Sequence, residues 1–310
     1  MRGRLILVLL AIVAVVVGLI PLGVGVYADW LWFDNLGYGS VLGARLAWMG
    51  AIRLGLGLLF FFFLLINLKA TRWAYEDTSS IRGQDVPPLI DSSLINRSFC
   101  VASLVLGFLI SSGLAGNWEI ITKFINRTPF GTVDPIFRRD IGFYVFTLPF
   151  LEQLYLSLQG LLLVTLIVVA LSYLFTRVVS ISKGRPTLVR RARVHLSIIL
   201  AVNLALKAGD YFLKMCRLVY SPRGAVFGAS YTDVHTQILT SKVLAITMGL
   251  VAIGVVWNAF RPRLRWLVGG AILLVLEAFL LGGVYPDLMQ RYVVEPNELA
   301  KEERFISYNI

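Results

Sequence analysis

The sequence predicts an all-α polytopic membrane protein with about seven transmembrane helices. Hydrophobic residues make up 57% of its 310 residues and charged residues only 15%, whereas soluble domains carry about 25% charged residues. The mean hydropathy is +0.77, and several apolar stretches reach roughly 20 residues, the length that crosses a bilayer as an α-helix. Lys and Arg gather in alternate connecting segments, as they do in multi-pass proteins.

The apolar stretches predict seven spans in order along the chain. The first apolar run is longer than the core of a signal peptide, which is about 7–15 residues, and no A-x-A cleavage pattern follows it. We therefore expect this run to be retained as the first helix. The seven spans cover about 5–26, 51–68, 98–116, 154–175, 194–215, 239–260 and 264–285.

The basic residues predict the orientation of these spans. Arg2 and Arg4 precede the first span, and the segments 69–97, 178–193 and 261–265 are rich in Lys and Arg. Cytoplasmic loops carry this excess, so we expect a cytoplasmic N-terminus, an extracytoplasmic C-terminus and a location in the cell membrane. Residues 1–285 then form the transmembrane domain. We expect residues 286–310 to begin an extracytoplasmic region that is otherwise missing from the sequence.

The net charge of +11 has the same explanation, because no basic run is interleaved with aromatic residues that could stack on bases. The sequence therefore predicts membrane lipids as partners and no nucleic acid. Cys100, Cys216, His195 and His235 are too few and too scattered for a metal or haem signature. We expect no cofactor, no metal and no catalytic residue, since no nucleophile–base pattern is present.

Ionisable residues inside the spans form the first candidate site. Glu277 lies in an apolar run, about 12 Å from the outer end of its span at 1.5 Å per residue. Asn203, Lys207 and Asp210 fall on one face of another span, and Lys242 enters a third span from the same side. An intramembrane charge costs roughly 2.5–3.5 kcal/mol or more unless it is paired. The cluster is either a site for an ion or proton, or a set of structural ion pairs.

Three stretches near the predicted outer face carry a resemblance to a family. They are "DPIFRRDIGFYVFTLPFLEQLY" at 134–155, "SPRGAVFGASYTDVHTQI" at 221–238 and "YPDLMQRYVVEPNELAKEERFISYNI" at 285–310. In these stretches and their order the chain resembles the bacterial membrane proteins of uncharacterised protein family 0182. The resemblance implies a seven-span membrane region followed by a large extracytoplasmic region. It implies no activity and no catalytic residue.

The same stretches supply the second candidate site. Arginines and polar residues there could hold an anionic headgroup or glycan, and they are Arg138, Arg139, Asp140, Arg223, Tyr231 and Asp233. The alternative is ordinary turn chemistry, in which Asp caps the backbone and Gly allows positive φ.

Two classes of function follow from these observations. In the first, the protein transports or binds an ion, a lipid or an envelope precursor. In the second, it is a non-catalytic anchor and assembly platform for its own extracytoplasmic region or for other envelope proteins. The buried charges favour the first class, and the charged C-terminal segment favours the second.

Overall fold

The computed structural model describes residues 20–21, 23–82, 92–176, 179–182, 185–224 and 226–310. Within these residues, six helices are long and apolar enough to cross a membrane. They cover Gly39–Arg72, Leu94–Gly116, Phe143–Phe175, Arg190–Tyr220, Asp233–Phe260 and Arg265–Asn309. These helices cover the second to the seventh predicted spans, which confirms a helical fold with six candidate membrane spans in the described residues. The first predicted span, about 5–26, falls largely outside the described residues.

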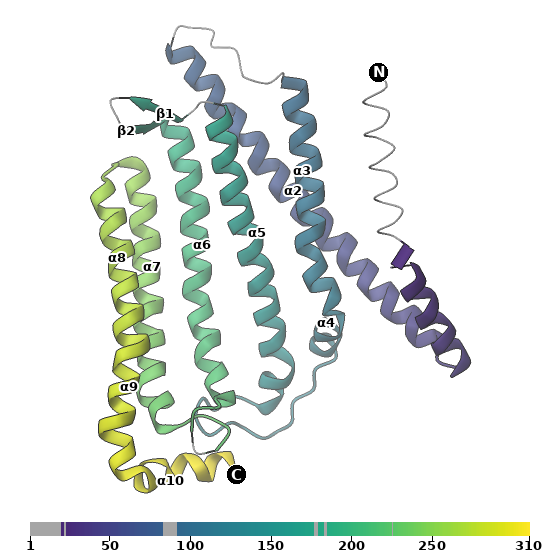
Figure 1. Cartoon of the computed structure of the whole chain (residues 1–310), viewed down its shortest axis with the longest axis vertical. Helices are drawn as coiled ribbons and strands as arrows, with labels where there is room; N and C mark the ends of the chain where they lie inside the picture. Colours follow the sequence, from purple (N-terminus) through teal and green to yellow (C-terminus); the bar gives the residue numbers. More distant parts are fainter. Residues whose placement is uncertain (1–19, 22, 83–91, 177–178, 183–184, 225) are drawn as a thin grey trace.

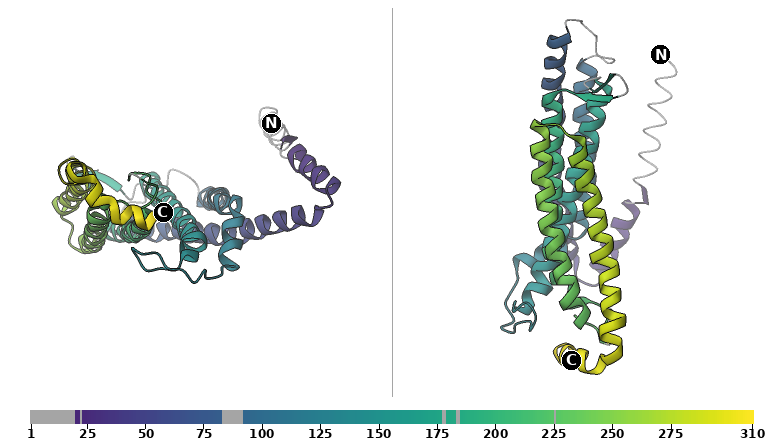
Figure 2. Two further views of the ribbon diagram at one scale, coloured as in Figure 1. Left: turned by 90° about the horizontal axis from the view of Figure 1, so that it is seen from below. Right: turned by 90° about the vertical axis from the view of Figure 1, so that its left-hand side faces the viewer.

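The long helices form a single curved layer. Its members are α2 (Gly39–Arg82), α3 (Ser92–Gly116), α5 (Leu148–Phe175), α6 (Arg190–Arg217), α7 (Ile238–Phe260) and α8 (Leu264–Phe279). In Figure 1 the helices α8, α7, α6, α5 and α3 stand side by side, and α2 crosses the layer obliquely against α3. Figure 2 shows that the layer is thin in the perpendicular direction. Most helices therefore contact only their neighbours, and their remaining apolar surface is available to lipid.

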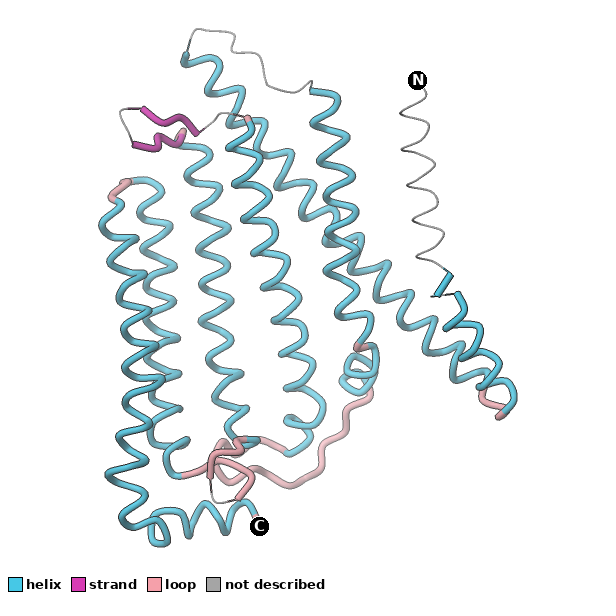
Figure 3. Tube along the Cα trace, viewed as in Figure 1, coloured by secondary structure: helices cyan, strands magenta, loops and turns pink. Residues whose placement is uncertain are grey.

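The connections between helices divide the molecule into two ends (Figure 3). One end holds the last residues of α2, α5 and α7, and we call it the basic end. It carries Arg190, Arg191, Arg193, Arg261, Arg263 and Arg265. The opposite end holds α4 (Trp118–Ile125), the loops 126–142 and 218–232, and α10 (Glu298–Asn309). This arrangement agrees with the predicted alternation of basic and less basic connections.

A short β-hairpin at the basic end is the one feature that the all-α prediction does not include. Strand β1 (Val179–Ser182) pairs with β2 (Arg185–Leu188) in antiparallel register, with Val179 opposite Leu188. The β-branched residues of this segment favour extended backbone. The hairpin lies outside the apolar spans, so the membrane-embedded part is still helical.

Small residues bring α2 and α3 into close contact. Ser103, Gly107 and Ser111 recur every four residues on α3, and both serines are fully buried. A Cβ on Gly107 would lie 2.7 Å from the backbone nitrogen of Phe61 on α2. Only glycine fits at this crossing, and such small-residue stripes are a common way for helices to pack in membranes.

A polar network joins three helices near the basic end. The Asn67 Nδ2 donates to the Phe63 carbonyl at 2.8 Å, which leaves its Oδ1 to accept from His195 Nε2 at 3.1 Å. His195 Nδ1 then accepts from the Tyr173 hydroxyl at 2.8 Å. This pattern assigns the tautomer with the proton on Nε2. A second bond, 3.0 Å long, links the hydroxyls of Thr71 and Ser172. These bonds tie α2, α5 and α6 together beside a buried apolar cluster that includes Leu68, Val169 and Ile199.

The last span is the least enclosed helix. In its most apolar window no residue is buried inside the protein, whereas the other five windows are 22–33% buried. The helix continues from α8 through the π-helical η4 (Leu280–Val284), α9 (Tyr285–Met289) and the π-helical η5 (Gln290–Val294). After the short 3₁₀ turn η6 (Glu295–Asn297), α10 turns across the end of the layer.

Substitution of His195 by Phe tests the polar network. The change leaves the Tyr173 hydroxyl and the side-chain Oδ1 of Asn67 without a partner in the protein interior. We therefore expect the free energy of unfolding in detergent to fall by about 1–3 kcal/mol. The matched control is Ile198→Phe, one turn further on the same helix at a side chain that is 49% exposed. Thermal unfolding that is identical for His195→Phe and the wild type would contradict this role.

Candidate functional site

The three stretches that carry the family resemblance meet at the end opposite the basic end (Figure 1), which we call the motif end. The Tyr144 hydroxyl from 134–155 donates to Asp134, and its ring lies edge-on to that of Tyr220. The stretches 221–238 and 285–310 also contact each other, because Asn309 Nδ2 donates to the Ala229 carbonyl at 3.3 Å. Residues far apart in the sequence thus build one surface.

A buried carboxylate organises the charges at this end. Asp210 on α6 is only 2% exposed. Its Oδ2 lies 2.8 Å from Lys207 Nζ and 3.9 Å from Lys214 Nζ, and its Oδ1 lies 2.8 Å from a guanidinium nitrogen of Arg217. A buried charge of this kind is tolerated only when it is paired and hydrogen-bonded. Three cations on one helix face therefore share one carboxylate as their ion-pair partner.

Arg217 extends this cluster to the neighbouring helix. Its Nε lies 3.0 Å from Glu152 Oε1 on α5 while another nitrogen holds Asp210. Arg217 is the last residue of α6, where cations also interact favourably with the free carbonyls of the helix end. One guanidinium thus joins α5 to α6.

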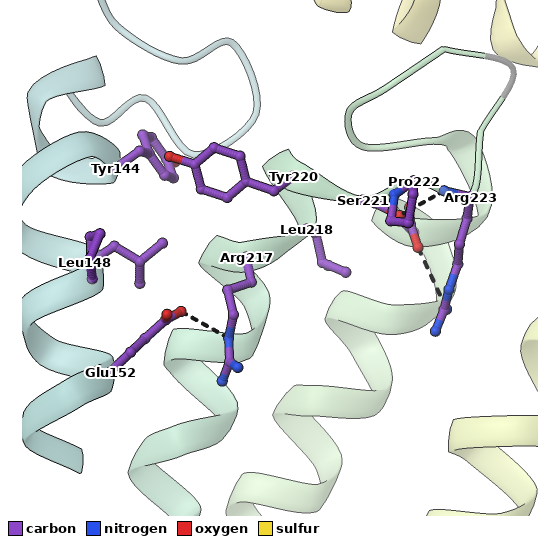
Figure 4. Close-up of a pocket in the computed structure, with 11 residues that line it drawn as sticks. Tyr144, Leu148, Glu152, Arg217, Leu218, Tyr220, Ser221, Pro222 and Arg223 are labelled. Atoms are coloured by element: carbon purple, nitrogen blue, oxygen red, sulfur yellow. Dashed lines mark hydrogen bonds and ion pairs between the residues drawn. The ribbon is translucent and has the colours of Figure 1, made fainter. Parts of the chain in front are cut away.

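A pocket of about 440 Å³ opens beside Arg217, between α5, α6 and the start of α7 (Figure 4). Two tyrosines and several apolar residues form its wall, and Glu152, Arg217, Arg223 and Asp233 supply its charges. Its described lining is Tyr144, Leu148, Pro149, Glu152, Arg217, Leu218, Tyr220, Ser221, Pro222, Arg223 and Asp233. We call it the motif-end pocket.

Asp233 is the most unusual residue of this pocket because its side chain is fully buried. Its Oδ2 accepts from the Ser230 N–H at 3.4 Å, and the Ser230 hydroxyl accepts from the Asp233 N–H at 3.2 Å. Its Oδ1 lies 3.8 Å from Arg223 but has no hydrogen-bond partner among the described residues. This oxygen is therefore compensated by the Arg223 ion pair alone.

Two π-helical segments place pocket residues. The segment η1 (Phe143–Thr147) precedes α5 and contains Tyr144, and η3 (Asp233–Gln237) precedes α7 and contains Asp233. Such segments are rare and often occur at functional sites, because one extra residue in a turn changes where a side chain points. Both flank the pocket, as expected of a functional site.

A side chain of helix α10 caps the first turn of the helix that leads into α7. The N–H of Tyr231 donates to both oxygens of the buried Glu302, each at 3.1 Å. The Tyr231 ring stacks on His235 at 3.9 Å, and Lys301 Nζ lies 5.1 Å from the same ring. A side chain of α10 thus satisfies a free N–H at a helix start. Residues 285–310 are packed against the bundle in this way.

The structure divides the predicted intramembrane cluster into separate contacts. Lys207 and Asp210 form an ion pair, and Asn203 accepts from Gln159 on α5. Glu277 instead accepts from the Thr247 hydroxyl at 3.2 Å, and within the described part of the chain no hydrogen bond or ion pair joins it to Lys207. The Lys242 side chain is exposed. A common role for these residues stays a prediction.

The Arg138-Arg139-Asp140 segment follows the turn at 135–137, Asp140 pairs with Val133, and none of the three residues lines the pocket. The N–H groups of Phe130, Gly131 and Gly142 donate to the Asp140 carboxylate at 3.1, 2.8 and 2.7 Å.

The hydrogen bond from Phe130 lowers the pKa of the Asp140 carboxyl most, and those from Gly142 and Gly131 lower it further. Desolvation raises this pKa, but the hydrogen bonds outweigh it. The Arg139 guanidinium lies 4.4 Å from the Phe143 ring, and Arg138 has a φ of 55°. Of the second predicted set, Arg223 and Asp233 line the pocket, and Tyr231 lies at the start of the adjacent helix, where Glu302 accepts from its N–H.

The sequence reasoning missed Glu152, Arg217, Tyr144 and Tyr220. Arg217 could have been found, because Lys207, Asp210, Lys214 and Arg217 follow one another at helical spacing on one face. Glu152 carries no comparable local signal, since its partner lies on another helix. No group of three or more potential metal ligands occurs in the described residues.

Comparisons with known proteins identify the family. Residues 6–310 match the model of the uncharacterised protein family UPF0182. A UPF0182 protein of Desulforamulus reducens is 35% identical over 96% of this chain and 34% of its own length. Those of Pelotomaculum thermopropionicum and Kocuria rhizophila are 34% and 37% identical, over 93% and 97% of this chain and 33% and 31% of theirs.

The chain spans about a third of the length of these curated relatives. No solved structure matches it. The match over nearly the whole chain, together with the relatives at more than 30% identity, shows that the chain belongs to the uncharacterised protein family UPF0182.

Proposed function

We propose that this chain is the membrane part of a transport or envelope-handling protein whose motif-end pocket binds the anionic headgroup of an amphiphilic envelope molecule. The occupant would be a membrane lipid or a lipid-linked envelope precursor. The observation that carries the proposal is the combination of Arg217 and Arg223 with an apolar wall at the end of the bundle, where the headgroup of a lipid lies.

The charges around the pocket favour an anion. The charges of the lining balance, with Arg217 and Arg223 against Glu152 and Asp233. Beside the lining, Lys207 and Lys214 face the single acid Asp210, which leaves one positive charge in excess. Guanidinium groups bind phosphate oxygens well because their N–H groups form a planar fork. A small inorganic anion would leave the wall of Leu148, Pro149 and Leu218 uncovered.

Titration with a short-chain lipid tests this proposal. Dihexanoyl phosphatidylglycerol should bind the purified protein in calorimetry, and dihexanoyl phosphatidylcholine should bind more weakly. Arg223→Gln removes a guanidinium whose side chain is 62% exposed but which pairs with the buried Asp233, so its melting curve is compared with that of the wild type before binding is measured. We expect it to weaken phosphatidylglycerol binding about tenfold, the effect of roughly 1.4 kcal/mol.

Arg127→Gln is the matched control, because it removes an exposed arginine at the same end that does not line the pocket. Equal binding of the two lipids, or an equal loss with Arg127→Gln, would refute the pocket as a headgroup site.

We further propose that the N-terminus is cytoplasmic, that the motif end faces outward and that the protein lies in the cell membrane. The arginines gathered at the basic end support this orientation. In a Cys100→Ser background, a membrane-impermeant maleimide added to intact cells should label Arg127→Cys and not Arg263→Cys. Cys216 is buried and gives little background. The reverse labelling pattern would contradict the orientation.

The alternative is a non-catalytic anchor for a large extracytoplasmic region. Two observations favour it: the chain spans about a third of its relatives' length, and α10 packs on the motif end through Glu302. Residues 1–285 would then be the membrane domain and residues 286–310 the start of that region. Absence of any Arg223-dependent lipid binding would favour this second function.

A further inference from the structure

A second cavity lies at the basic end, between α7 and α8. It measures about 800 Å³ and is lined by residues of both helices and of the turn that joins them. We call it the α7–α8 cleft. It is remote from the motif end, because the residues of the α7–α8 turn line it and this turn stands at the opposite end of the layer in Figure 1. The cleft shares no lining residue with the motif-end pocket.

The mouth of the cleft is basic and aromatic. Arg261 and Arg263 line it, and the Arg261 guanidinium lies 5.5 Å from the Trp257 ring. The Arg263 N–H donates to Asn258 Oδ1 at 2.7 Å, which fixes the turn. Among the described residues of the lining there is no Asp or Glu. Two positive charges therefore meet at the mouth without an acid in the cleft wall to neutralise them.

The deeper part of the cleft is apolar and unfilled. An added Cβ would meet nothing within 4 Å at Gly254 on α7 or at Gly269 on α8. Glycines on facing helices usually allow close contact, but here they leave a gap that is walled by Leu250 and Leu273. At the mouth, Trp257 and Trp266 are 65% and 66% exposed, as expected of tryptophans at the headgroup level.

We infer that the α7–α8 cleft binds one anionic phospholipid. Its phosphate contacts Arg261 and Arg263, and one acyl chain fills the space beside Gly254 and Gly269. A basic pocket between transmembrane helices suits an acidic headgroup, and the apolar wall of Leu250, Ile253 and Leu273 suits an acyl chain. Since α8 has no buried residue in its most apolar window, the lipid also covers a face that the protein itself leaves open.

Fluorescence quenching by brominated lipids tests this inference, because Trp257 and Trp266 flank the proposed site. The purified protein in detergent micelles is titrated with phosphatidylglycerol or phosphatidylcholine that carries brominated acyl chains. Subtraction of the quenching of Trp257→Phe/Trp266→Phe isolates the cleft. We expect saturable quenching at a low mole fraction of the anionic lipid only.

Two variants distinguish the contribution of the charges from that of the empty space, and two more are controls. Arg261→Gln/Arg263→Gln should raise the half-saturating lipid fraction at least about tenfold. Gly254→Leu should remove the saturable part because its side chain fills the cleft while the charges remain. Arg265→Gln is the control: it removes an exposed arginine at the same end that does not line the cleft. Arg223→Gln should also have no effect, so failure at one site is distinguishable from failure at the other.

Three results would overturn the inference. They are equal saturable quenching by both lipids, an equal effect of Arg265→Gln, and quenching that never saturates. In the last case, a stable dimer that Gly254→Leu converts to a monomer would identify the cleft as an interface between two copies. The melting curve of each variant shows that a lost signal does not come from unfolding.

Discussion

The Asp210 carboxylate is the interaction on which the motif end depends. It is buried, and its removal from water is costly unless cations compensate for it. Lys207, Lys214 and Arg217 provide that compensation from the same helix. Arg217 also forms an ion pair with Glu152 of α5. The pocket wall then follows, because Arg217 and Glu152 both line it. One acid thus keeps several cations in place beside a lipid-facing surface.

The rest of the bundle shows why such polar contacts matter. A single layer of helices buries little apolar surface, and between helices in lipid the hydrophobic effect contributes little. Specific contacts therefore determine which helices are neighbours: the Gly107 crossing of α2 and α3, the His195 network and the Asp210 cluster. The helices between these contacts present apolar side chains to the membrane. Cavities occur at both ends, where polar residues and apolar walls meet.

Hydropathy and basic loops were sufficient to predict spans two to seven and the alternation of the connections, because both depend only on local composition. The shared face of Asn203, Lys207 and Asp210 was also readable from helical spacing. The partner of Glu277 was not, since it depends on which helices are neighbours and on their rotation. For the same reason the sequence did not show that the Lys242 side chain is exposed or that Glu152 belongs to the cluster. The hairpin at 179–188 was missed because its strands are only four residues long.

Two double-mutant cycles on unfolding in detergent test the role of Asp210 most directly. The first combines Lys207→Met with Asp210→Asn, and the second combines Lys207→Met with Glu277→Gln. Residues in contact couple by about 0.5–3 kcal/mol, and independent ones add within about 0.5 kcal/mol. We expect coupling of about 1 kcal/mol or more in the first cycle and additive effects in the second. Stronger coupling of Lys207 to Glu277 than to Asp210 would contradict the account.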